Sequence, residues 1–423
     1  MKQKHHRMLC AFCALVILVS TVFPTAAFAE QPVDAAAAEQ TLTRADAAEM
    51  QQADAAVTVL TESEQYQEMD TDARKDAALA QLDTLAAKGL VEKDSIYTDE
   101  ENGMVSFRYP CGVLGGILLT EPEDETLDEE NAETETTSNA LPLRLPPDLG
   151  AEMQKSRAAL LRRTENQAVE KFGTAVIYYA FDNTINSSRF PYYSYMQGFW
   201  SALGLETKIN IHVTVADLKK MGNYNVSVLS AHGSYYTYSY GKFLKRTRTE
   251  PIMLLTEEST FGKDLRYGFD LLAHRVIKVN GMYCVTSDFF RNAYKGGKLS
   301  NTIVYSETCE FLGVDGSEDN AMADALLSGG AQAVIGYVNN VYTVYSRSML
   351  WDTINHLIMG QNVGQALEHA KATYGEDDLI WYHAQGGRRP HAAASYAVLY
   401  GNSQAALHVP ESNRSMFSAD LAA

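Results

Sequence analysis

Cysteine and basic residues are both scarce in this chain. Only five of the 423 residues are cysteine, which excludes a small scaffold held together by disulfides. The chain has 35 Lys and Arg against 53 Asp and Glu, and the resulting formal charge of −18 argues against a general nucleic-acid binder. With 46% hydrophobic and 21% charged residues, the composition is that of a globular protein with a sizeable core.

Long apolar runs are also lacking, apart from one near the N-terminus. Lys2, Lys4 and Arg7 precede an apolar stretch of about 15 residues, 8–22, which is short for a membrane span. A small-x-small cleavage site follows at 27–29. We expect a signal peptide over 1–29 and a secreted protein without a stable membrane anchor; the alternative is an uncleaved anchor. Three cysteines would then remain, so at least one thiol is expected to be free. They are Cys111, Cys284 and Cys309.

Charge divides the rest of the chain. Residues 30–149 hold 28 acidic and 7 basic residues, whereas residues 150–423 hold 25 of each. Residues 30–120 are interpreted as an acidic N-terminal prosegment or domain, with a helix over 71–88 capped by Thr71 and short strands at 104–109 and 113–119. Residues 121–150 are acidic and then Pro-rich, which indicates a disordered linker. Residues 151–423 form the predicted catalytic domain.

Strands and helices alternate from residue 151 onward. This order predicts an α/β fold with a mainly parallel sheet that has helices on both faces. The segment 276–285 contains Asn-Gly between two apolar runs, which predicts a hairpin. The Tyr-rich segment 233–241 is interpreted as a packed flap or an edge strand. The main strands are expected at 175–182, 209–213, 226–233, 302–309, 333–337 and 395–400. The helices are expected at 153–172, 193–203, 215–221, 287–294, 320–328, 347–359 and 363–374.

Two predicted strands end in chemically capable residues. His232 and Gly233 follow one strand, and Cys309 ends another. In parallel sheets, ligand sites lie beyond the carboxyl ends of the strands, so neighbouring strands would bring the imidazole and the thiol together. Imidazole beside thiol is the arrangement of nucleophilic catalysis, and the Gly233 and Cys309 amides could form an oxyanion hole. Taken singly, His-Gly is more often a turn, and a lone cysteine is more often a small buried hydrophobe.

The segments around these residues resemble a known family. VSVLSAHG, IVYSETCEFLG, ALLSGGAQAVIGY, GQNVGQALEHAKATYG and YAVLYGNSQAAL are similar to the caspase-like cysteine peptidases, which include clostripain, gingipains, legumain, separase and the caspases. The resemblance covers roughly 173–410 and has His before Cys, as that group does. It implies a caspase-like fold with His232 as base and Cys309 as nucleophile. The stretch around Cys309 lacks the full signature of caspases, clostripain or legumain, so substrate specificity stays open.

An acid near Cys309 indicates a specificity. Glu307 lies two residues before Cys309, on the same face of a strand. The resemblance implies that this position lines the pocket for the residue before the scissile bond, where a carboxylate favours Arg or Lys. The alternative is an internal ion pair between Glu307 and a basic residue. Asp182, at the end of the first strand, is a second candidate for substrate binding.

Metal ligands are not evident in the sequence. Asp315, Glu318 and Asp319 could hold calcium, but their spacing is not that of an EF-hand, and a solvated loop that caps the next helix is the favoured interpretation. The histidines outside the predicted dyad show no metal-ligand spacing, so no metal or other cofactor is predicted. Protein or peptide substrates are the expected partners, and nucleic acid is not.

These features together predict a secreted cysteine endopeptidase. It would be made as a zymogen that cuts itself at basic sites, either near the linker or in the cluster 242–248. Two alternatives remain open. One is a transpeptidase or ligase that uses the same thioester, and the other is a catalytically silent caspase-like binding or scaffold protein.

Overall fold

The computed structural model describes residues 41–120, 149–164, 169–181, 191–241, 245–379 and 394–417. The predicted signal peptide, Asp182 and residues 121–148 of the predicted linker lie outside the described residues. The described residues belong to one compact unit that contains two main β-sheets, A and B. None of the helices in these ranges has the length and apolar character needed to span a bilayer.

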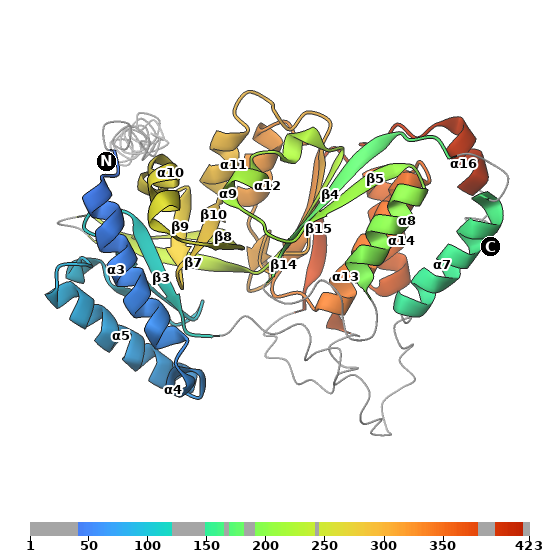
Figure 1. Cartoon of the computed structure of the whole chain (residues 1–423). Helices are drawn as coiled ribbons and strands as arrows, with labels where there is room; N and C mark the ends of the chain where they lie inside the picture. The colour runs from blue at the N-terminus through green and yellow to red at the C-terminus, as the bar shows by residue number, and fades with distance from the viewer. Residues whose placement is uncertain are drawn as a thin grey trace, which may run out of the picture. The chain divides into compact units, whose positions relative to one another are not determined.

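Sheet B has six strands in the order β15-β14-β11-β6-β4-β5 (Figure 1). Five of them are parallel, and only the edge strand β15 pairs antiparallel, with β14. The prediction of a mainly parallel sheet is therefore confirmed. The strands are β4 (Gly173–Ala180), β5 (Leu205–Asn210), β6 (Val226–Ala231), β11 (Ile303–Ser306), β14 (Ala333–Val338) and β15 (Tyr396–Gly401).

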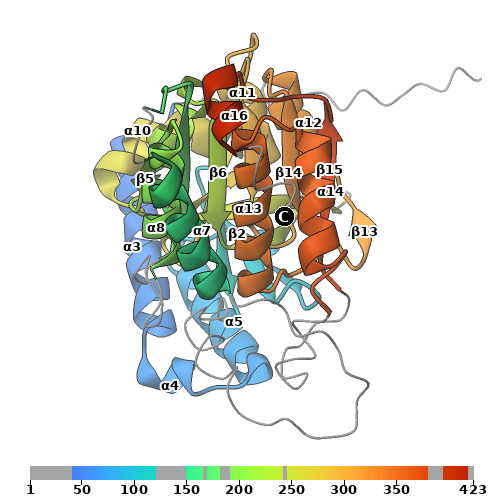
Figure 2. The ribbon, with the colours of Figure 1, turned by 90° about the vertical axis from the view of Figure 1, so that its right-hand side faces the viewer.

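Helices cover both faces of sheet B, as predicted. Along β4, Ile177 and Tyr179 pack into the core with helices α8, α13 and α14, which lie together in Figure 2. Val176 and Tyr178 point to the opposite core, which contains α11 and α12. Because both faces are buried, the strands read as continuous apolar runs. The helices are α7 (Leu149–Thr164), α8 (Tyr192–Ala202), α11 (Ser287–Ala293), α12 (Ala321–Ser328), α13 (Thr343–Ile358) and α14 (Val363–Tyr374).

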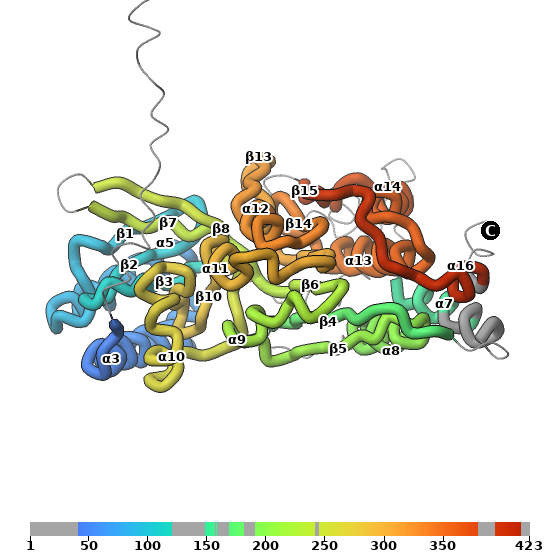
Figure 3. The backbone as a smooth tube through the Cα atoms, turned by 90° about the horizontal axis from the view of Figure 1, so that it is seen from above, coloured from blue at the N-terminus to red at the C-terminus, as the bar shows by residue number. Residues whose placement is uncertain are grey.

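Sheet A was not predicted as a unit. Its order is β1-β2-β3-β9-β10-β8-β7, and it joins the acidic N-terminal segment to the chain between His232 and Cys309. The sheet nearly closes, because Ser106 on β2 donates a hydrogen bond to the Thr237 carbonyl on β7 (2.6 Å). Figure 3 shows its long edge hairpin of β7 and β8. The strands are β1 (Tyr97–Asp99), β2 (Met104–Arg108), β3 (Leu114–Leu118), β7 (Gly233–Tyr240), β8 (Arg246–Glu258), β9 (Val276–Val279) and β10 (Met282–Thr286).

Two local predictions within sheet A are confirmed, although the sequence did not predict that these segments belong to one sheet. The Asn280-Gly281 turn between β9 and β10 has positive φ at both residues (47° and 77°), which explains the glycine. Strand β7 is the edge strand that the Tyr-rich segment predicted. Strand β5 begins four residues earlier than expected, at Leu205. Strand β8 was not predicted.

The N-terminal helices pack against sheet A. The helix predicted at 71–88 is α5, but its cap is Asp70, which accepts a hydrogen bond from the Ala73 N–H (2.8 Å), and not Thr71. The acidic segment is thus continuous with the rest of the compact unit through both sheet pairing and helix packing. The helices here are α3 (Arg44–Thr61), α5 (Thr71–Ala87) and α10 (Phe261–Leu272).

Shorter elements complete the described chain. They are α4 (Glu64–Gln67), η1 (Lys93–Ser95), α9 (Val215–Leu218), η3 (Met221–Asn223), β12 (Gly313–Val314), β13 (Ser317–Glu318) and α16 (Glu411–Phe417).

Candidate active site

The ends of strands β6 and β11 lie side by side. The two strands are parallel neighbours with Ser306 opposite Leu229, so continuing this register by three residues places Cys309 level with His232. The backbones approach closely there, since a Cβ atom at position 233 would stand 2.1 Å from the Cys309 carbonyl oxygen. The predicted neighbouring of these two strand ends is therefore confirmed.

Gly233 is required by this close approach. The atom that this glycine accommodates is the carbonyl oxygen of Cys309 in its own chain. Gly233 also begins β7, so the chain passes from sheet B to sheet A at His232. His232 and Cys309 therefore lie where sheet B continues into sheet A.

The sulfur of Cys309 lies near a backbone donor. The thiol is half-buried, and its Sγ lies 3.4 Å from the backbone nitrogen of Val341, which follows β14. The thiol donates to the carbonyl oxygen of the same residue (3.9 Å), so Val341 positions the sulfur through both of its backbone groups. Val341 was not singled out from the sequence, because a backbone donor contributed by another strand leaves no signal in residue type.

His232 is held by aromatic packing and by the β-ladder. Its ring makes an edge contact with Phe181, which follows β4, with 4.5 Å between ring centroids. Its carbonyl accepts a hydrogen bond from the Leu254 N–H (2.9 Å). His232 and Leu254 are thus a hydrogen-bonded pair of the antiparallel ladder between β7 and β8. Hydrogen-bonded and non-hydrogen-bonded pairs alternate along such a ladder. The next pair, Gly233 and Met253, is therefore not hydrogen-bonded, and the Gly233 N–H is directed away from β8.

Glu307 takes part in a buried polar network. Its side chain accepts hydrogen bonds from the Tyr193 hydroxyl (3.0 Å) and the Ser346 hydroxyl (3.4 Å). The same Tyr193 oxygen accepts from the Arg347 Nε (3.3 Å), and the buried Arg347 guanidinium lies over the rings of Tyr192 and Tyr193. A basic residue therefore lies in the internal network of Glu307, linked to it through Tyr193.

The partners of Glu307 could not be found from sequence. Tyr193 lies on α8 and Ser346 and Arg347 on α13, far from Glu307 along the chain. In the sequence these residues read only as members of amphipathic helices. Asp182, the second predicted substrate-binding acid, lies outside the described residues.

Glu310 is a titratable group beside Cys309. It follows Cys309 directly, with a left-handed backbone (φ 54°). Burial, reinforced by the nearby Asp315 carboxylate, raises the pKa of Glu310 to about 7. Carboxyls with raised pKa values are common at functional sites, and Glu310 directly follows Cys309, so we add it to the candidate residues.

The acidic loop after Cys309 uses its carboxylates internally. Asp319 accepts hydrogen bonds from the Tyr235 hydroxyl (3.0 Å) and from the backbone N–H of Ala321 at the start of α12 (2.9 Å). Glu318 accepts one from the Tyr400 hydroxyl (2.6 Å). These contacts support the helix-capping interpretation of the loop more than the calcium interpretation.

The other two cysteines of the described chain differ from Cys309. All three are free thiols. Cys284 is fully buried in sheet A and Cys111 is half-buried, and burial raises the pKa of both thiols. Neither is suited to act as a nucleophile at neutral pH.

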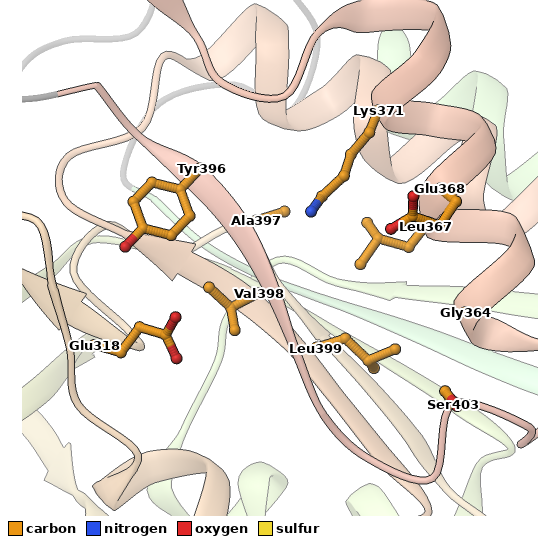
Figure 4. A pocket seen from close by; sticks show the side chains of 10 residues that line it. All are labelled: Glu318, Gly364, Leu367, Glu368, Lys371, Tyr396, Ala397, Val398, Leu399 and Ser403. Carbon is orange, nitrogen blue, oxygen red and sulfur yellow. The ribbon is translucent and has the colours of Figure 1, made fainter.

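A separate cavity of about 440 Å³ lies between β15 and α14 (Figure 4). Its lining combines the apolar side chains of Val398 and Leu399 with the polar groups of Lys371, Glu318 and Tyr396. It includes neither His232 nor Cys309 and is therefore distinct from the candidate active site.

The sequence was compared with family models and with curated proteins, and neither comparison found a match. A function for this chain is therefore inferred from the residues at the junction of the two sheets.

Proposed function

We propose that the protein is a secreted cysteine endopeptidase of caspase-like fold, with Cys309 as nucleophile and His232 as general base and then acid. The observation that carries this proposal is the close approach of the Gly233 backbone to the Cys309 carbonyl, just beyond the ends of the parallel neighbours β6 and β11. The Val341 N–H directed at the sulfur supports it, because a nucleophilic cysteine must be available as thiolate.

The reaction proceeds through a thioester. His232 takes the Cys309 proton, and the sulfur attacks the carbonyl carbon of the scissile bond. The amides of Gly233 and Cys309 are proposed to stabilise the oxyanion. His232 then gives the proton to the leaving nitrogen and the C–N bond breaks. Water, deprotonated by His232, attacks the thioester; the acid product leaves and the thiol is restored.

Activity measurements on three variants test the dyad. We expect the purified protein to cleave a peptide library, and Cys309→Ala or His232→Ala to lose at least about a thousandfold in rate, because both residues act on the reacting atoms. Cys111→Ala is the matched control and should keep its activity. Full activity in either dyad variant would rule out the assignment.

Specificity for Arg or Lys before the scissile bond is proposed from Glu307. The carboxylate is already bound by Tyr193 and Ser346, so a basic substrate would have to join this network. Glu307→Gln is expected to weaken a basic preference while Cys309 still reacts with alkylating agents. A cleavage profile dominated by acidic residues before the scissile bond would instead indicate that Arg347 determines the specificity. A profile dominated by apolar residues would exclude this role for both Glu307 and Arg347.

The two alternatives give different products. A transpeptidase would transfer the acyl group to an added amine, which mass spectrometry of the products would detect. A silent scaffold would cleave nothing, and its Cys309 would react no faster than an ordinary thiol. We favour the peptidase because the thiol is accompanied by both an imidazole and a backbone donor.

Self-processing is part of the same proposal. Basic residues near the linker and in 242–248 are the proposed sites. Of the latter cluster, Arg246 and Arg248 lie within β8, paired with β7, which makes them poorer sites than an exposed loop. To test this, purified wild-type and Cys309→Ala precursors are incubated side by side and their fragments are identified by mass spectrometry. Self-cleavage predicts fragments from the wild-type protein only, whereas equal cutting of both proteins would show that another protease does the trimming.

A further inference from the structure

Two histidines and an aspartate meet between helices α13 and α14, away from the candidate active site. Asp352 and His356 are one turn apart on α13, and His369 lies on α14. A potential ligand atom from each residue lies within 4.8 Å of those of the other two. Among the described residues, this is the only such group of His, Cys, Asp and Glu.

The geometry centres on one carboxylate oxygen. Asp352 Oδ2 lies 2.7 Å from His369 Nδ1 and 3.5 Å from His356 Nδ1. The two imidazole rings lie close together, tilted by 32° to each other, with 3.7 Å between their centroids.

The helices hold these residues firmly but leave one side open. His356 is buried and its Nδ1 contacts the Asp352 carbonyl (3.0 Å), whereas the His369 side chain is 45% exposed. Asp352 is largely covered, at 14%. Two ligands are therefore fixed on one helix, and the third can move at the surface to complete a site.

We propose that Asp352, His356 and His369 bind a divalent transition metal, with Zn²⁺ the best fit. Two imidazoles and a carboxylate are a ligand set that zinc takes, with a fourth position left for water. Tetrahedral zinc needs ligand atoms about 3.3 Å apart, so the 2.7 Å separation of Asp352 Oδ2 and His369 Nδ1 would have to widen when the metal binds. The exposed His369 supplies that movement.

The site fastens two helices, one of which builds the candidate active site. Ser346, a partner of Glu307, lies six residues before Asp352 on α13, which is about 9 Å along the helix axis. A bound metal would stabilise the α13–α14 pair and hence the folded state by mass action. The proposal does not depend on peptidase activity.

The test is zinc binding by the full-length protein in a Cys309→Ala background, so that the candidate active-site thiol cannot bind the metal. After chelator treatment, calorimetry with ZnCl₂ should show one bound equivalent and thermal unfolding should shift upward. His369→Ala and Asp352→Asn should each weaken binding by at least about tenfold and remove the shift. Co²⁺ should give a visible absorption spectrum that both variants lose.

His212→Ala is the matched control, since His212 is an exposed histidine on another part of the surface. It should bind zinc like the parent protein. Circular dichroism shows whether each variant keeps its fold. If His369→Ala does not fold, the comparison is made with Asp352→Asn. Absence of zinc binding, or equal binding in the parent and a folded His369→Ala or Asp352→Asn variant, would overturn the proposal.

Discussion

At the scale of single residues, the close fit of Gly233 against the Cys309 carbonyl defines the candidate site. His232 and Cys309 could be predicted because their residue types and their positions after apolar runs are both visible in the sequence. The network of Glu307 could not, because Tyr193 and Arg347 come from helices distant along the chain. Residue type marks a candidate nucleophile, but only the fold reveals what surrounds it.

A second buried acid gives a prediction about stability. Glu250 on β8 is 4% exposed, and burial raises its pKa to about 7. Its Oε2 has no hydrogen-bond partner among the described residues, although the Arg248 guanidinium lies 3.5 Å away. Ionisation is therefore costlier in the folded state than in the unfolded state, and stability falls as pH rises from about 4.5 to 7.

Glu250→Gln should remove this cost. At pH 8 the variant is expected to be more stable than wild type by on the order of 2–3 kcal/mol, and near pH 4.5 this gain should vanish. Denaturant unfolding at the two pH values measures the difference. Glu258→Gln, at an exposed position on the same strand, is the control and should change little. A variant that is no more stable at pH 8 than wild type would refute this account of Glu250.

At the scale of elements, strands and helices of sheet B follow from the sequence, whereas sheet A does not. The four central strands of sheet B are buried on both faces and give nearly continuous apolar runs, whereas the edge strands β5 and β15 are partly exposed. The pairing of β3 with β9 joins segments about 160 residues apart, and periodicity carries no information about such partners. Strand β8 begins with alternating Arg and Thr, which gave no apolar signal.

A buried ion cluster ties helix α3 to sheet A. The fully buried Lys278 on β9 lies 2.5 Å from Asp54 on α3 and 2.9 Å from Asp264 on α10. The hydroxyls of Tyr109 and Tyr283 donate to the same two carboxylates. This cluster holds together three elements that are distant along the chain.

Lys278→Met should destabilise the protein strongly, because it leaves two buried carboxylates without their cation. Loss of one partner of a buried pair costs about 3–5 kcal/mol. Chemical denaturation measures this, with Lys295→Met, at an exposed position, as control. Replacing Lys278, Asp54 and Asp264 together by apolar residues should restore part of the loss. An unchanged midpoint in Lys278→Met would show that the cluster contributes no stability.

At the scale of the whole molecule, the acidic N-terminal segment shares sheet A with the chain between His232 and Cys309. The sequence suggested a prosegment because charge changes abruptly near residue 150. The distribution of charge reports on surface residues, however, and not on how the core is packed. The apolar residues of β2 and β3 pack inside the same cores as those of β8 to β10. A cut in the linker would therefore leave both pieces joined.

We expect a protein cut within 121–148 to remain one particle. After cleavage at an inserted protease site, the two fragments should elute together in gel filtration and separate only in denaturant. A protein that lacks 41–120 should fail to fold, since β9 would lose its partner β3. Release of the N-terminal fragment under native conditions would contradict this prediction and restore a removable prosegment.

The reactivity of Cys309 tests the central claim most directly. Timed iodoacetamide labelling with peptide mass spectrometry gives separate rates for Cys309 and Cys111 in one sample. We predict that Cys309 reacts at least about 100-fold faster than Cys111 at neutral pH, and that His232→Ala removes most of this advantage. If Cys309 reacts no faster than Cys111, or keeps its full rate in a folded His232→Ala protein, the proposed dyad is wrong.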